Sequence, residues 1–247
     1  IINYVTPAAP EDFGGHAQLM GGSRDFGLLH ARVGGSGLLA DFVHKQGDGA
    51  RDNSDHRLDD LNLKFSRQLT DAQSVTLRAN LYREDSTVTY AGLTQAEFTR
   101  LGARYNPFEN DGFVTDRRGL SASHRWSLAP ALTLTTSAWY SYFDRDWWRQ
   151  ASTSQDGQCS AAFNARRISG LAVDVASCNS VQGRLRTYDQ YGVEPRLTWR
   201  NRAGELQAGV KWQIEEQDRR QVNGTSPRAR TGTLVEDNLR DTEARSV

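Results

Sequence analysis

The chain has 247 residues, of which 30 are basic and 30 acidic, so its formal net charge is zero. This length suits one large domain or two small ones, and the balanced charge gives no reason to expect nucleic acid or an acidic partner. No run of about 18 apolar residues occurs, so no membrane-spanning helix is expected, whereas membrane-spanning strands would leave only a weak hydropathy signal.

Alternating apolar and polar residues predict about ten strands. In chain order they are expected at 13–21, 26–34, 37–46, 56–69, 73–85, 116–128, 131–147, 184–200, 204–220 and from about 234 to the end. Within 131–147, leucine, alanine and tyrosine from Leu132 to Tyr142 share one face, while threonine, serine and tryptophan from Thr133 to Ser141 share the other. Many of these strands exceed ten residues, about twice the usual length in globular proteins.

The connections between these strands alternate in length. Short turns are expected at 34–37, 69–73, 128–131 and 201–204, and long polar loops at 47–55, 86–115, 148–183 and 221–233. This alternation is typical of outer-membrane barrels, which have short periplasmic turns and long external loops. The sequence therefore predicts an all-β, antiparallel transmembrane β-barrel fragment of about ten meander strands. A soluble β-sandwich is the alternative.

Two local features refine this prediction. Thr94 is expected to cap a short helix over 95–101, since an N-cap residue there precedes helix formers. If the apolar face meets lipid, five aromatic residues would anchor it at the membrane interfaces, whereas in a soluble protein they would belong to an ordinary sheet core. These residues are Trp126, Tyr140, Tyr142, Trp199 and Trp212.

The two cysteines, Cys159 and Cys178, lie in the same polar segment. They are either free thiols or a local disulfide, and their isolation in one loop favours the disulfide and hence an oxidising compartment. Closing this loop would stabilise the fold by roughly 3 kcal/mol in the chain-entropy model. Zinc is not expected because no CxxC or nearby histidine pair occurs, and the histidines at 16, 30, 44, 56 and 124 lack ligand spacing.

Catalytic motifs do not occur in the sequence. There is no GxSxG elbow, no GxxxxGK[ST] phosphate loop and no HExxH metal motif, and the glycines of 34–37 belong to a turn between strands. The chain is therefore not expected to be an enzyme.

Several stretches resemble a known family. The opening IINYVT resembles the last plug strand of TonB-dependent outer-membrane receptors, and the stretches at 56–66, 89–98, 106–126 and 184–199 resemble their ferric dicitrate subfamily. The resemblance implies that 1–10 end the plug and its linker, that 11–247 form the N-terminal part of the barrel, and that the chain is a piece of a longer protein. It also implies uptake of an anionic ferric chelate (ferric citrate or another siderophore) across the bacterial outer membrane. TonB would power this uptake through the plug, and no resident cofactor would be needed.

Strand alternation singles out arginines that could hold such a chelate. Arg145, Arg149 and Arg186 are expected on the lumen face near the external end, where a guanidinium binds carboxylates two oxygens at a time. The resemblance places Arg145 and Arg186 in the ferric dicitrate pocket and a third family arginine near Arg240. The alternative for each arginine is a solvated charge or a lumen salt bridge with a neighbouring acid such as Asp144 or Asp146.

Arg117 and Arg118 are neighbours and are therefore expected on opposite faces of their strand. Arg117 is expected to face the lumen and Arg118 the outer interface, where it would snorkel. A porin-like channel would share the barrel but need no plug. A soluble secreted β-sandwich would instead bind glycans through Trp147 and Trp148.

Overall fold

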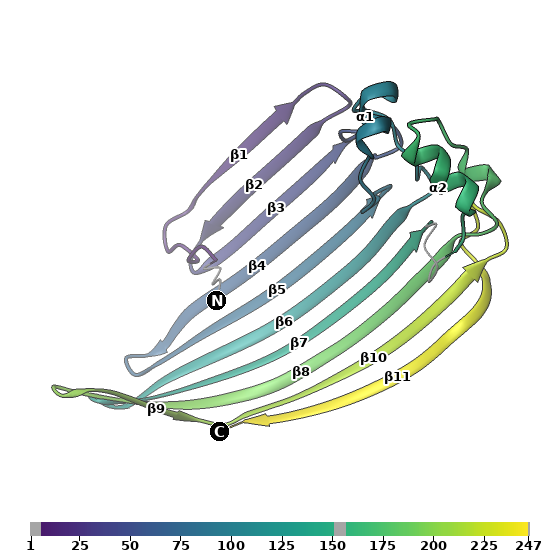
Figure 1. The fold of residues 1–247 in the computed structure, drawn as a ribbon. Coiled ribbons are helices and arrows are strands. Elements are labelled where there is room, and N and C mark those ends of the chain that lie inside the picture. The colour runs from purple at the N-terminus through teal and green to yellow at the C-terminus, as the bar shows by residue number, and fades with distance from the viewer. Residues whose placement is uncertain (1–5, 151–156, 247) are drawn as a thin grey trace.

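The computed structural model describes residues 6–150 and 157–246, and most of them belong to one antiparallel sheet (Figure 1). Its strands follow the chain in order from β1 to β8 and then β10 and β11, with β9 also paired to β8. The strands are β1 (Gly14–Gly21), β2 (Gly27–Gly35), β3 (Leu38–Gly47), β4 (His56–Thr70), β5 (Gln73–Ser86), β6 (Gly112–Ala129), β7 (Leu132–Arg149), β8 (Gln182–Asn201), β9 (Gly204–Gly209), β10 (Lys211–Gly224) and β11 (Gly232–Ser246). The predicted meander is confirmed.

The strand predicted at 204–220 is interrupted at Val210, which separates β9 from β10. Both parts keep the same register on β8, since Gly209 pairs with Arg196 and Trp212 with Val193. Val210 N–H donates to the Pro195 carbonyl over 3.1 Å, but proline has no N–H for the return bond. The missing N–H of Pro195 therefore interrupts the hydrogen-bond ladder between this segment and β8, but the pairing resumes beyond it.

The sheet has an apolar face and a polar face. Cross-strand partners share a face, so one row joins Leu63, Ala79, Leu120, Tyr140, Tyr191 and Ile214, and the adjacent row joins Asn62, Asn80, Gly119, Ser141, Gln190 and Glu215. We call these the outer and inner faces. The outer face is not covered by other elements: Leu120 is 60% exposed and Tyr140 42% exposed. The five predicted interface aromatics all lie on it.

The soluble β-sandwich alternative is wrong. A sandwich would bury one face of the sheet against a second sheet, whereas a single curved sheet with a bare apolar face forms here (Figure 1). Trp148 is only 4% exposed, so it offers no platform for a glycan.

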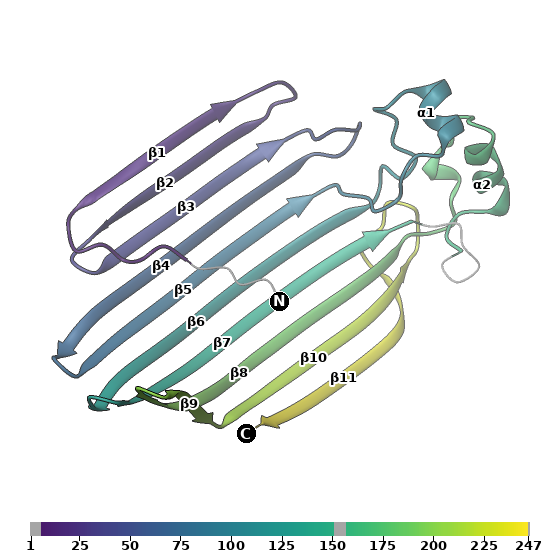
Figure 2. The ribbon, with the colours of Figure 1, turned by 60° about the vertical axis from the view of Figure 1, so that its left-hand side comes forward.

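The long connections gather at one end of the sheet, where Figures 1 and 2 both place the helices. Helix α1 (Gln95–Leu101) begins as predicted: the Thr94 side chain accepts from Glu97 N–H, and the Glu97 carboxylate accepts from Thr94 N–H. Helix α2 (Ala161–Ile168) and the 3-10 turn η1 (Val175–Ser177) were not predicted. Within the described ranges, neither α-helix is long and apolar enough to cross a membrane.

A cluster of buried apolar residues lies at this loop end rather than between layers. It consists of Phe108, Cys159, Phe163, Val175 and Cys178. The two cysteines form a disulfide with their Cα atoms 4.3 Å apart. Arg167 on α2 pairs with the fully buried Glu97 carboxylate on α1 over 2.8 and 3.1 Å. A disulfide and a buried ion pair thus hold the two loop segments together.

Candidate ligand-binding site

Three arginines lie side by side on the inner face near the loop end. Arg145 on β7 is directly opposite Arg186 on β8, which is directly opposite Arg219 on β10. Directly paired residues have Cα atoms about 4.5–5.5 Å apart and project to the same side. We call these three residues the arginine row.

The charges of the arginine row are poorly compensated. Arg186 is 5% exposed, and within the described residues its Nη1 donates to the backbone carbonyls of Leu185 and Arg220, each over 3.3 Å. The Nε atoms of Arg145 and Arg219 are buried without a hydrogen-bond partner. Among the described residues none of the three arginines forms an ion pair, although Glu236 on β11 lies close enough to act on Arg186 through space. Like charges directly opposite one another destabilise a sheet, so this row is suited to an anion.

The carboxylates next to Arg145 in sequence do not pair with it. Asp144 and Asp146 point to the outer face because side chains alternate along a strand, and Asp144 accepts a hydrogen bond from Thr187 over 2.8 Å. Neither Asp144 nor Asp146 therefore forms a salt bridge with Arg145 in this structure.

The other two predicted arginines flank the row. Arg240 pairs with Gln217, two residues along β10 from Arg219, so it lies on the same face at a diagonal position. Arg149 is four residues beyond Arg145 on β7, about 13 Å toward the loops. Its Nη1 donates to the Tyr90 hydroxyl over 3.0 Å.

Arg219 was not among the predicted site residues. The alternation of 204–220 puts it on the same face as Gln213, so its face was predictable, but its position opposite Arg186 depends on the register of β8 and β10. The faces of Arg117 and Arg118 are as predicted. Arg117 lies over the Tyr82 ring on the inner face, and Arg118 bonds to Asp116 over 2.7 Å on the outer face.

A buried carboxylate lies at the rim above the arginine row. Asp111 is 1% exposed, and its Oδ1 accepts from Gln150 N–H over 2.6 Å. Burial raises its pKa from 3.8 to about 7, although Thr89, Arg149 and Arg230 lie close and favour the charged form. Arg230 also donates to the carbonyl of Asn110 over 2.9 Å, which ties the β10–β11 connection to this rim.

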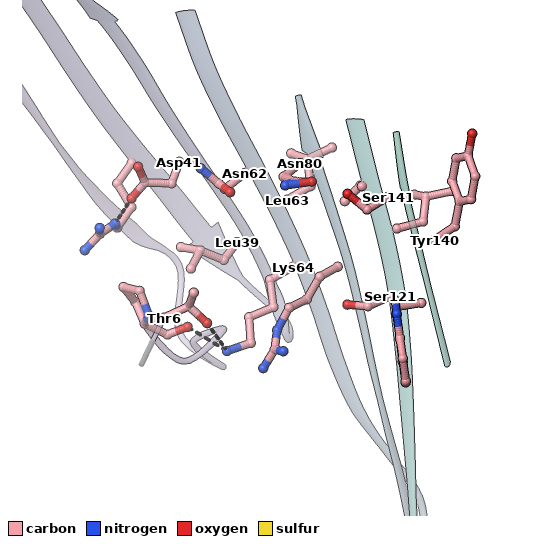
Figure 3. Close-up of a pocket in the computed structure, with 17 residues that line it drawn as sticks. Thr6, Leu39, Asp41, Asn62, Leu63, Lys64, Asn80, Ser121, Tyr140 and Ser141 are labelled. Atoms are coloured by element: carbon pink, nitrogen blue, oxygen red, sulfur yellow. Dashed lines mark hydrogen bonds and ion pairs between the residues drawn. The ribbon is translucent and has the colours of Figure 1, made fainter. Parts of the chain in front are cut away.

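A cavity of about 450 Å³ lies nearer the short turns and is distinct from the arginine row (Figure 3). Its inner-face lining includes Lys64, whose Nζ donates to the carbonyl of Pro7 over 2.8 Å, so the segment before β1 crosses this face. Ser141 points into the cavity and Tyr140 away from it (Figure 3). Ser141 is four residues from Arg145 along β7, about 13 Å.

Comparisons with known proteins establish the fold. No family model matches the chain, and no curated protein is similar to it. Solved structures are similar, beginning with the ferric citrate transporter FecA in the unliganded form (18% identity, TM-score 0.73, 97% of this chain and 35% of that chain). The siderophore receptor PiuA from Acinetobacter baumannii matches at 12% identity and a TM-score of 0.65 over 96% of this chain and 38% of its own. The ferric-catecholate import receptor Fiu from K12 E. coli, in its closed form, matches at 14% and 0.66 over 96% and 38%.

The chain has the fold of a transmembrane β-barrel fragment. The arginine row lies on the face that such a barrel encloses. At identities of 18% and below, these matches show the fold alone, and the chain spans little more than a third of the length of each of the three structures. Their names are those of transporters and receptors rather than enzymes.

Proposed function

We propose that this chain is part of a TonB-dependent receptor of the bacterial outer membrane that takes up an anionic ferric chelate, ferric citrate or another ferric siderophore. The observation that carries the proposal is the arginine row, three guanidinium groups in register on the enclosed face of the fold. In this reading 1–10 end the plug and its linker, and 11–247 build the early barrel. TonB acts through the plug, and lipid covers the outer face.

The chemistry of the arginine row fits carboxylates better than a bare cation. A chelator already fills the coordination sphere of the iron, so the protein needs to supply only charge and shape to the complex. Guanidinium groups bind carboxylate oxygens in pairs and stay charged. The names of the similar structures support a ferric chelate, and they include both a citrate and a catecholate complex.

Each arginine has a defined part in this proposal. Arg145, Arg186 and Arg219 hold the anionic groups of the chelate. Arg240 extends the positive surface toward the short turns, and Arg149 extends it toward the loops. Binding would offset the repulsion within the row, because a ligand anion placed between two guanidiniums attracts both.

The direct test is ferric citrate binding by the complete protein that carries this chain, with surface levels matched. Arg145→Ala and Arg186→Ala should each weaken binding about tenfold to a hundredfold, because each removes a charge-assisted bond of roughly 1.5–3 kcal/mol. Lysine should restore only part of the affinity because it lacks the planar fork. Arg118→Ala is the matched control, since Arg118 lies on the outer face.

Two results would contradict the proposal. Unchanged affinity in both variants would leave these arginines as ordinary lumen charges. Iron uptake that continues at the normal rate in cells without TonB would favour the porin-like channel instead.

A further inference from the structure

Trp147 lies between two arginines of the site. It is on β7, two residues from Arg145 and two from Arg149, and strand alternation puts all three side chains on one face. The Arg145 guanidinium is 5.9 Å from the centroid of the Trp147 ring, and the Arg149 guanidinium is 5.2 Å from it. One indole ring therefore contacts two cations.

The same ring system reaches the long segment 86–111. The Tyr90 ring meets the Trp147 ring edge-on, with centroids 5.6 Å apart, and Arg149 lies 5.5 Å from the Tyr90 centroid. Tyr90 is 59% exposed, so this stack ends at solvent. Arg145, Trp147, Arg149 and Tyr90 thus form a continuous chain of contacts from the arginine row to the rim.

The Trp147 ring is the attractive contact that the structure shows for the Arg145 side chain. The Arg145 Nε is buried without a hydrogen-bond partner, and within the described part of the chain its side chain forms no ion pair. The electron-rich face of an indole attracts a guanidinium most strongly where water is excluded. Without the ring, repulsion from Arg186 directly opposite would favour moving the Arg145 guanidinium out of the row.

We propose that Trp147 is a positioning residue of the ligand site, an inference that rests on the proposed function. Its indole holds the Arg145 guanidinium in the arginine row. The same ring also contacts Arg149 and Tyr90 and holds them at the rim. Trp147 itself does not touch the ligand. An aliphatic side chain of similar bulk fills the space but does not hold the cations.

The test compares Trp147→Leu, Trp147→Phe and Trp147→Tyr in the complete protein, with ferric citrate and a ferric catecholate as probes. Leu should weaken binding of the accepted probe about tenfold, while Phe and Tyr, which keep an aromatic face, should stay within about threefold of the parent. Trp199→Leu is the matched control, because Trp199 lies on the outer face and is 47% exposed. Equal losses in the Leu, Phe and Tyr variants, or no loss in the Leu variant, would overturn the proposal.

A double-mutant cycle separates positioning from general loss of structure. If Trp147 acts through Arg145, Trp147→Leu should cost less affinity in an Arg145→Ala background than in the parent, because only its contact with Arg149 is then left to lose, so the two losses should not add. Additive losses would overturn the proposal. The comparison requires only that each variant still assembles, and Trp147→Phe is a milder variant for the same cycle. Failure of the parent to bind either probe would refute the proposed function and Trp147's role with it. A normal loss in Arg145→Ala with no loss in Trp147→Leu would refute the role of Trp147 alone.

Discussion

Replacing Arg186 by glutamine should weaken ligand binding and at the same time make the sheet more stable. Arg186 is the central residue of the arginine row, with Arg145 directly opposite on one side and Arg219 on the other. Like charges directly opposite each other are unfavourable by roughly 0.2–1 kcal/mol per pair, so removing the central charge relieves about 0.4–2 kcal/mol. Glutamine retains a donor for the backbone carbonyls that Arg186 serves.

The two outer arginines provide an internal comparison. Arg219→Gln relieves one like-charge pair in the row, so it should stabilise by about half as much as Arg186→Gln. Arg145→Gln also relieves one pair but loses the contact with the Trp147 ring, so its gain should be smaller than that of Arg219→Gln. Unfolding of the purified protein in detergent, followed by the loss of its heat-resistant folded band or by tryptophan fluorescence, measures this order. Arg118→Gln should give no gain because it breaks the bond to Asp116.

Ligand should stabilise the parent protein more than the Arg186→Gln variant. Ligand binding stabilises the folded protein by a free energy that grows with the logarithm of the affinity. At the same ferric citrate concentration, the unfolding temperature of the parent should therefore rise more than that of Arg186→Gln, which binds more weakly. The reasoning is refuted if Arg186→Gln without ligand is no more stable than the parent, because the row would then carry no unrelieved repulsion.

Three further predictions concern the rim and the outer face. Replacing Cys159 and its partner by serine should loosen the segment 157–181 by up to about 3 kcal/mol, seen as faster protease cleavage there with no change in sheet unfolding; equal cleavage would show that the bridge contributes little. The pKa of Asp111 is raised in the folded rim, so between about pH 4 and 7 its carboxyl group stays protonated when the rim is folded and loses its proton when the rim opens locally. The free energy of this opening should therefore fall by up to about 1.4 kcal/mol per pH unit as the pH rises. Hydrogen exchange at the Gln150 amide, corrected for intrinsic rate, should show this, and Asp111→Asn should abolish it; a pH dependence that survives this substitution would assign it to another group. Leu120→Arg on the outer face should cost about 2–4 kcal/mol near the bilayer midplane, whereas Ser121→Arg on the inner face should be tolerated; equal losses in denaturant unfolding would contradict the assignment of the faces.

Local patterns in the sequence determine the strands, their two faces and the start of α1 in this protein. Period-two alternation assigns Arg145 and Arg186 to the inner face because successive side chains in a strand must point to opposite sides. Thr94 and Glu97 specify the start of α1 because each satisfies a backbone N–H of the other residue. Pro195 marks the missing ladder bond at Val210, although only the paired register shows where its effect falls.

Contacts between distant segments are decided by the tertiary structure alone. Alternation says which face a residue occupies but not its height on the neighbouring strand, so only the register brings Arg219 level with Arg186. Helix α2 was missed because Phe163 is buried against Phe108, more than fifty residues earlier, rather than against its own neighbours. From the sequence, Trp147 had a role only in the glycan-binding alternative. Its contacts with Arg149 and Tyr90 come from the fold, since a cation–π stack depends on distances that no one-dimensional pattern contains.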